Sequence, residues 1–277
     1  FNLNKSLYLD ILVICLCVGL FGYSVYKGLD KGIKNLSNFN LILALVFLLI
    51  IIFSTDIIGL IQTSVSGLLF SIMHFWDMST LGISEESQFA EEWTIFYWAW
   101  WVAFGPLVGL FIARISRGRT LRQVILGMLF FGTLGTWLFY MILGGYAMNL
   151  ELSGEFSVIQ SMNSYGHADT AIAVVKNLSF EILMVFIFCL ITIIFVTTSY
   201  DSMSYVISYH VMKTSNENKE PDKKLRLFWA IILGILPAAL VIYSDHSVAL
   251  DIILITSLPL MLIYPLMAIS IYRELIQ

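Results

Sequence analysis

Charged residues are scarce in this chain. Asp, Glu, Lys and Arg make up 12% of its 277 residues, whereas hydrophobic residues make up 59% and the mean hydropathy is +0.87. A typical soluble domain carries roughly 25% charged residues. This composition therefore excludes an ordinary soluble domain and predicts an all-helical protein that crosses a membrane several times.

Cysteine is also rare. Cys15, Cys17 and Cys189 all lie in apolar stretches. Thiols in such surroundings favour small core residues over a disulfide framework or a metal site.

The residues that would support other functions are missing or scattered. We find no nucleophile–base pair and no phosphate-binding loop, so the sequence predicts neither an enzyme nor a protein driven by ATP. No basic block with interleaved aromatic residues supports nucleic-acid binding. The four histidines lie in separate segments, without the spacing of metal ligands, at His74, His167, His210 and His246. No organic cofactor is expected.

What the sequence does contain is a series of long apolar runs. A helix of roughly 20 apolar residues crosses a bilayer core of roughly 30 Å. Seven runs are predicted to do so, at residues 7–26, 39–60, 93–113, 123–147, 171–200, 227–243 and 250–271. Residues 61–77 are more polar and carry apolar residues on one face, so they predict an amphipathic helix on the membrane surface. Residues 148–170 are predicted to form a polar loop.

The distribution of charge supports this layout. If residues 27–34 lie inside the cell, strict alternation also places 114–122, 213–226 and 273 inside. Those positions hold 13 of the 15 Lys and Arg residues. The opposite side holds acidic residues, namely Glu85, Glu86, Glu91, Glu92, Glu151, Glu155, Asp245 and Asp251. This positive-inside asymmetry predicts a multi-pass protein of the cell membrane.

The third run has an unusual composition for a membrane span. Trp98, Trp100 and Trp101 lie one to two turns inside it, although Trp is normally found at the interfaces. Trp98 and Trp101 share a helix face, which Gly105 continues. Gly105 and Pro106 are predicted to interrupt the helix, and such breaks often mark substrate sites in transporters. The alternative is an interfacial aromatic belt followed by a proline kink.

A second polar feature lies at the inner end of the fifth run. Thr197, Thr198 and Ser199 place three hydroxyl groups side by side. Hydroxyl groups in a helix usually bond back to their own backbone. The functional alternative is a site for a hard cation, built from hydroxyl and carbonyl oxygens.

The segment from Trp93 to Thr120, with WTIFYWAWW and ARISRGRT, resembles the signature segment of the betaine/choline/carnitine transporter family. The resemblance implies a LeuT-like inverted-repeat fold of about twelve membrane helices. This chain holds about seven, so we expect it to be part of a longer protein. By that resemblance, residues 1–60 are the last helices of the first repeat, 93–277 are the second repeat, and the protein is a homotrimer.

The resemblance also implies a substrate site of aromatic rings. A ring attracts a quaternary ammonium ion through its negative face. Trp101 is expected to contact the substrate, with support from Trp98 and Trp100, and Phe96 matches a family residue near the substrate. Phe104 stands where the family commonly has another Trp.

Sodium is the coupling ion that the resemblance implies. Phe195 would supply a backbone oxygen, and Thr198 and Ser199 would supply hydroxyl groups. Asn40 is neutral at a position where sodium-independent exchangers of the family carry Arg, so the cation site is left for an ion. Leu107 replaces an aromatic residue that is usual at a second cation site, which argues against a second sodium ion.

We therefore predict a secondary transporter that takes up a quaternary-ammonium solute, such as glycine betaine or choline, by sodium-coupled alternating access. One alternative is a sodium-independent exchanger. Another is a membrane sensor or channel that kept the fold without transporting.

Overall fold

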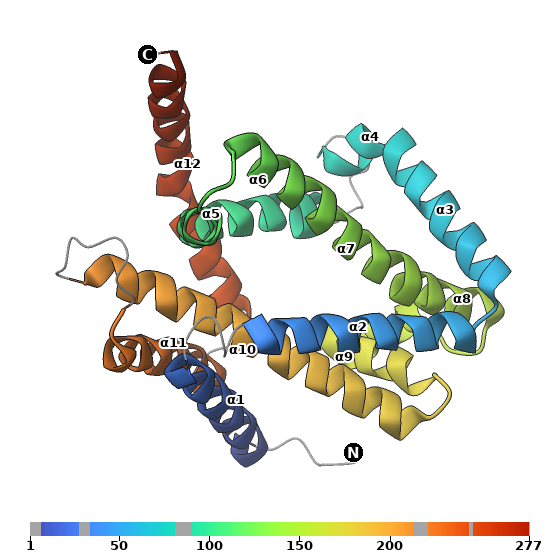
Figure 1. Ribbon diagram of the computed structural model, residues 1–277. Helices are drawn as coiled ribbons and strands as arrows, with labels where there is room; N and C mark the ends of the chain where they lie inside the picture. Colours follow the sequence, from blue (N-terminus) through green and yellow to red (C-terminus); the bar gives the residue numbers. More distant parts are fainter. Residues whose placement is uncertain (1–6, 28–33, 81–89, 213–220, 244–245, 277) are drawn as a thin grey trace.

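The computed structural model describes residues 7–27, 34–80, 90–212, 221–243 and 246–276, which are helical apart from short connections (Figure 1). The first helices are α1 (Leu7–Lys27), α2 (Lys34–Ser54), α3 (Ile57–Met73) and α4 (Phe75–Ser79). A π-helical turn, η2 (Ala90–Ile95), leads into α5 (Phe96–Ile115). The last helices are α9 (Val158–Lys176), α10 (Glu181–Val211), α11 (Lys223–Tyr243) and α12 (His246–Ile276).

One long helical rod joins α5 to α9. It contains α6 (Leu121–Gly127), η3 (Met128–Gly132), α7 (Thr133–Phe139), η4 (Tyr140–Gly144) and α8 (Gly145–Ser153). Thr120 caps its start: the Thr120 hydroxyl accepts from the Gln123 amide, and the Gln123 side chain accepts from the Thr120 amide. Gly154, at φ 74°, ends the rod in the left-handed conformation that glycine tolerates best.

Five of the described helical segments are long and apolar enough to cross a membrane: Lys34–Ser54, Trp93–Ile115, Leu121–Ser153, Glu181–Val211 and Asp251–Glu274. The two other expected spans, at 7–26 and 227–243, are helical as α1 and α11. That all seven cross the bilayer, and that they form half of an inverted-repeat fold, remain predictions.

The outer surfaces of these helices are apolar. In the rod, Phe130 is 64% exposed and Phe131 is 71% exposed. Monomeric soluble proteins rarely expose apolar patches of this extent. Lipid is the environment that such a surface requires.

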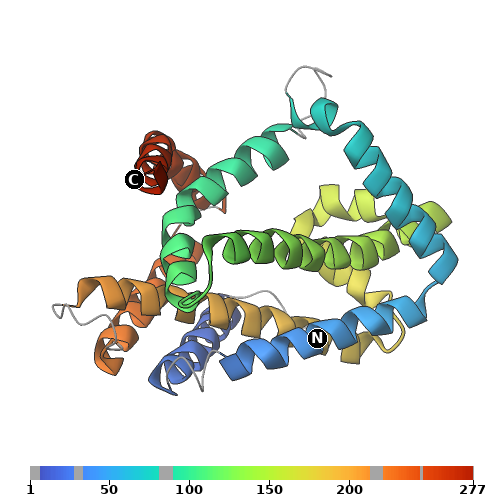
Figure 2. The same ribbon diagram turned by 45° about the horizontal axis from the view of Figure 1, so that its top comes forward.

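The core lies between α2 and α10, which run antiparallel (Figures 1 and 2). Phe47 and Ile51 of α2 are fully buried, as is Met184 of α10. The ring centroids of Phe47 and Phe188 are 5.8 Å apart. Close packing of this kind holds helices together in lipid, where burial from water contributes little.

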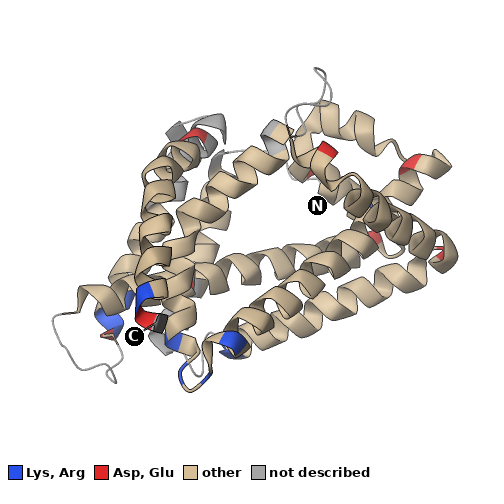
Figure 3. Cartoon of the chain, turned by 90° about the horizontal axis from the view of Figure 1, so that it is seen from above, with Lys and Arg blue, Asp and Glu red and all other residues tan. Residues whose placement is uncertain are grey.

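Charge is segregated as the sequence predicts. Figure 3 shows most Lys and Arg together at the lower left, while most Asp and Glu lie toward the top and right.

The prediction of a polar loop over 148–170 is wrong. α8 continues through Ser153, and α9 begins at Val158, where Ser157 accepts a hydrogen bond from the Gln160 amide. A polar sequence does not prevent helix formation when caps satisfy the free amide groups.

The fifth span also has different limits. The sequence predicts one span over 171–200, but α9 ends at Lys176 and α10 runs from Glu181 to Val211. Phe180 adopts a left-handed conformation at φ 62° in the turn between them. Within this turn Leu178 is 4% exposed and Phe180 is 79% exposed, but both are apolar, so hydropathy does not reveal the turn.

The boundary between the second span and the amphipathic helix lies earlier than expected. α2 ends at Ser54, and Asp56 caps α3 by accepting hydrogen bonds from the amides of Ile58 and Gly59, both at 3.1 Å. Ser64 of α3 then donates to the Met141 carbonyl of the rod at 2.8 Å. The position of this helix on the membrane surface remains a prediction.

Candidate substrate and cation sites

The aromatic residues of α5 and the preceding turn form a ladder along one side of the helix. Trp100 is at its centre, with ring centroids 5.9 Å from Phe96, 5.6 Å from Tyr97 and 6.3 Å from Phe104. Trp93 stacks on Tyr97 at 5.5 Å. These residues are three or four positions apart, which is the spacing that brings side chains together on a helix.

Trp98 lies away from this ladder. It is two residues from Trp100, so helical geometry turns it to nearly the opposite side. Trp98 borders an apolar cavity of about 390 Å³ between α5 and α12. The α12 residues that line this cavity are Leu254, Ile255, Ser257, Leu258 and Met261.

Trp101 is the residue for which the sequence predicts direct contact with substrate. Its side chain is 64% exposed, and that of Trp98 is 68% exposed. The described residues therefore bring Phe96, Trp100 and Phe104 together but do not close a cage around Trp101. A cage would need rings from other parts of the protein, so the roles of the five aromatic residues remain predictions.

The predicted interruption at Gly105 and Pro106 is absent. α5 is one continuous helix from Phe96 to Ile115 with Pro106 inside it. A hydrogen bond from another helix explains why the proline is tolerated: the Tyr264 hydroxyl of α12 donates to the Val102 carbonyl at 3.1 Å.

The predicted cation ligands gather on one turn of α10. The Thr198 hydroxyl lies 2.9 Å and the Ser199 hydroxyl 3.0 Å from the Phe195 carbonyl oxygen, to which both donate. This is the usual back-bonding of helix hydroxyls, and it also places three oxygens side by side. Each hydroxyl oxygen keeps lone pairs that a hard cation can use.

Asn40 lies at about the same level of the α2–α10 pair as this turn. Phe47 and Phe188 are in contact and join the antiparallel helices α2 and α10. Measured from this pair, Asn40 on α2 and Phe195 on α10 are the same number of residues away and in the same direction. Asn40 is therefore level with Phe195. Its side chain is 8% exposed, and its Oδ1 has no hydrogen-bond partner among the described residues. A buried amide oxygen without a partner is costly, and a cation would satisfy it.

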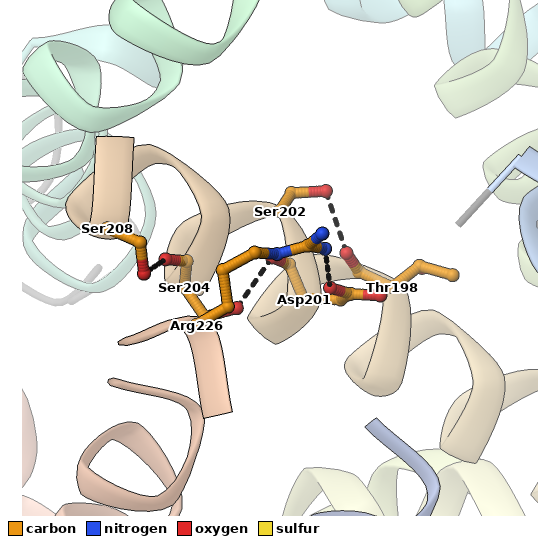
Figure 4. Close-up of polar contacts among 6 residues, drawn as sticks. All are labelled: Thr198, Asp201, Ser202, Ser204, Ser208 and Arg226. Atoms are coloured by element: carbon orange, nitrogen blue, oxygen red, sulfur yellow. Dashed lines mark hydrogen bonds and ion pairs between the residues drawn. The ribbon is translucent and has the colours of Figure 1, made fainter. Parts of the chain in front are cut away.

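A buried ion pair lies one turn beyond the hydroxyl cluster (Figure 4). Arg226 Nη2 of α11 is 3.3 Å from Asp201 Oδ1, and the two side chains are 1% and 0% exposed. The Arg226 guanidinium also lies 5.1 Å from the centre of the Tyr205 ring. From the sequence, Arg226 is predicted only as one of the charges on the inner side of the membrane. The signal for its burial is its place immediately before the apolar part of α11.

The C-terminal ends of α5 and α10 are also connected. Arg114 donates through Nε to the Tyr205 hydroxyl at 3.2 Å and through Nη1 to the Tyr209 hydroxyl at 3.4 Å. Its guanidinium lies 4.3 Å from the centre of the Tyr209 ring. The helix with the aromatic residues is thus tied to the helix with the hydroxyl cluster.

The whole chain, residues 1–277, matches the family model described as BCCT, betaine/carnitine/choline family transporter. It is 32% identical to a glycine betaine transporter, OpuD, of Bacillus subtilis, over 99% of this chain and 53% of that protein. It is 28% identical to a carnitine transporter of Acinetobacter baumannii, over 96% of this chain and 49% of that protein. It is also 28% identical to the high-affinity choline transport protein of Escherichia coli, over 99% of this chain and 41% of that protein. The chain spans about half the length of the curated relatives that it matches.

Proposed function

This chain belongs to the betaine/carnitine/choline transporter family of integral membrane transporters, and from this premise we propose that it forms part of a secondary transporter for a quaternary-ammonium solute. The observation that carries the proposal is the aromatic content of α5. Between Trp93 and Ala113 this span has no ionisable side chain except Tyr97, yet it presents a series of rings. Rings attract a permanent cation without requiring it to pair with a carboxylate.

In this proposal Trp101 contacts the ammonium group directly. Its exposed ring is accessible to a ligand or to rings from other helices of the whole protein. The ladder around Trp100 lies on the same helix, with Tyr97 one turn before Trp101. Binding between rings lowers the cost of removing the ammonium group from water, because the ring faces partly replace its hydration.

We further propose that sodium binds at the Phe195–Thr198–Ser199 turn and drives uptake. Asn40 supports this site, because its buried amide oxygen lies level with Phe195 and has no partner in the described part of the chain. Its neutral side chain also leaves the ionic charge to be supplied by a cation. The Arg114 bonds to Tyr205 and Tyr209 give a physical route by which ordering α10 would bias α5.

Coupling then follows as a difference in affinity between two states. Sodium must bind more tightly to the state in which Trp101 closes on the solute. A ligand with equal affinity for both states does not shift the equilibrium between them. As the resemblance to the family implies, the protein would alternate between outward-open and inward-open states. It would also assemble as a trimer in the cell membrane.

The test is uptake by the full-length protein reconstituted in liposomes. Labelled glycine betaine and labelled choline are offered with an inward sodium gradient, and again with potassium in place of sodium. Saturable uptake that requires sodium supports the proposal. Exchange that is indifferent to sodium identifies an exchanger instead, and an absence of any saturable uptake contradicts the proposed substrate class.

A further inference from the structure

Pro106 leaves one backbone carbonyl group of α5 without its helical hydrogen-bond donor. Proline has no amide hydrogen, so the carbonyl four residues earlier, that of Val102, loses its helical donor. In lipid there is no water to replace that donor. The Tyr264 hydroxyl of α12 donates to this same carbonyl, at 3.1 Å.

Gly105 makes the approach of Tyr264 feasible. A Cβ atom added at Gly105 would overlap the Tyr264 hydroxyl oxygen and would lie 3.0 Å from Cζ of the same ring. Only a residue without a side chain leaves that space open. Proline frees the carbonyl, glycine opens the path to it, and tyrosine supplies the missing hydrogen.

The bond also lies next to the proposed substrate residue. Val102 directly follows Trp101, so the Tyr264 hydroxyl bonds to the backbone one residue after the one that carries the indole ring. Trp98, one turn earlier, borders the cavity that α5 shares with α12. The path of α5 through its aromatic stretch is thus fixed by a bond to another helix.

We propose that Tyr264 is a positioning residue for the substrate site: its hydroxyl replaces the backbone donor that Pro106 lacks and sets the placement of Trp101 relative to α12. This inference rests on the proposed function, in which Trp101 contacts the solute. It assigns to α12 a role in solute affinity, although α12 contributes none of the predicted solute contacts.

The test is a double-mutant cycle in the full-length protein, with Tyr264→Phe, Pro106→Ala and the combination. Tyr264→Phe removes only the hydroxyl. Pro106→Ala restores the amide, so Val102 regains a donor within its own helix. We expect Tyr264→Phe to raise the KM for solute uptake about three- to tenfold with a smaller change in Vmax, and to raise it less than about twofold when Pro106→Ala is present. Tyr272→Phe is the matched control, because Tyr272 is also on α12 and is 67% exposed.

Equal effects of Tyr264→Phe in both backgrounds would overturn the inference, as would no effect in the wild-type background. If Pro106→Ala does not fold, Gly105→Ala displaces the Tyr264 hydroxyl while leaving the proline in place. Its KM should then match that of Tyr264→Phe, and combining the two should add nothing further. Additive losses would overturn the inference.

Thermal unfolding of the purified protein without solute separates this inference from the proposed function. Tyr264→Phe should lower the midpoint by about 2 °C in the wild type and by less in Pro106→Ala. If the wild type takes up neither solute, the substrate class is rejected, while a non-additive unfolding cycle still supports the Tyr264–Val102 bond. An additive unfolding cycle overturns the bond whatever the protein transports. If the two substitutions are non-additive in the unfolding midpoint but additive in KM, the bond has only a structural role. That result overturns the positioning role of Tyr264.

Discussion

Arg226 and Asp201 join α11 to α10 through an ion pair from which water is excluded. Nη2 of Arg226 lies 3.3 Å from Oδ1 of Asp201, and neither side chain is more than 1% exposed. The Ser204 hydroxyl bonds to the Asp201 carbonyl at 2.8 Å, on the same turn (Figure 4). The pair lies within one turn of Thr198 and Ser199, so it fixes the part of α10 that carries the proposed cation site.

We expect Arg226→Met to destabilise the protein by about 3–5 kcal/mol, because it leaves the Asp201 carboxylate buried without its cation. Asp201→Leu together with Arg226→Met should cost less than Arg226→Met alone, since no buried charge remains. Thermal unfolding of the purified protein measures both effects. Arg119→Met, in an exposed turn, is the control and should leave the midpoint unchanged. A double variant at least as unstable as Arg226→Met alone would contradict this expectation.

Trp101→Leu should weaken solute binding about two- to thirtyfold, which corresponds to a cation–π contribution of about 0.5–2 kcal/mol. Binding can be measured by titrating the purified protein with glycine betaine or choline. Trp137→Leu is the matched control, because Trp137 is a partly exposed Trp in a different apolar helix and lies outside the proposed site. Equal losses in the two variants would count against a role for Trp101 in binding.

The sequence predicts the membrane class and the family of this chain because both depend on local patterns: apolar runs, loop charges and one dense aromatic segment. It misses features that depend on contacts between distant segments. Pro106 and Gly105 predict an interruption that the continuous helix α5 does not contain, and nothing near them identifies Tyr264, far along the chain, as the replacement donor. Likewise, the sequence does not distinguish Arg226 from the other basic residues of the segment 213–226. Its partner, Asp201, lies on a different helix, α10.

The side of a helix on which a residue lies is another property that composition does not give. Trp98 and Trp100 are near neighbours in sequence, and both are predicted to support the substrate site. The structure turns Trp100 into the aromatic ladder and Trp98 toward α12. Such a division follows from the helical repeat, but the elements that face each side become known only from the packing of the whole chain.

Thr198→Ala and Ser199→Ala should each raise the sodium concentration for half-maximal uptake roughly tenfold, since each removes one oxygen ligand from a charged group. Thr192→Ala is the control on the same helix. Thr192 makes the same kind of back-bond, to the Phe188 carbonyl at 2.9 Å, but lies away from the cluster. Uptake measured against sodium at fixed solute distinguishes the variants. Unchanged sodium dependence in Thr198→Ala would remove this turn from the coupling site.

Asn40 offers a test of charge at the same place. Asn40→Arg should bring a guanidinium level with Phe195, where its charge would take the place of sodium, so uptake should lose its sodium stimulation while residual uptake or exchange remains. Asn40→Leu removes the buried amide oxygen without supplying charge, and should lower uptake at all sodium concentrations without creating sodium-independent flux. Parallel assays in sodium and in potassium measure the difference. If the two variants behave alike, the loss comes from altered packing of α2 against α10, and charge at Asn40 has no part in coupling. If only Asn40→Arg transports without sodium, a single cation at this level of the membrane is sufficient to hold α10 in its binding state.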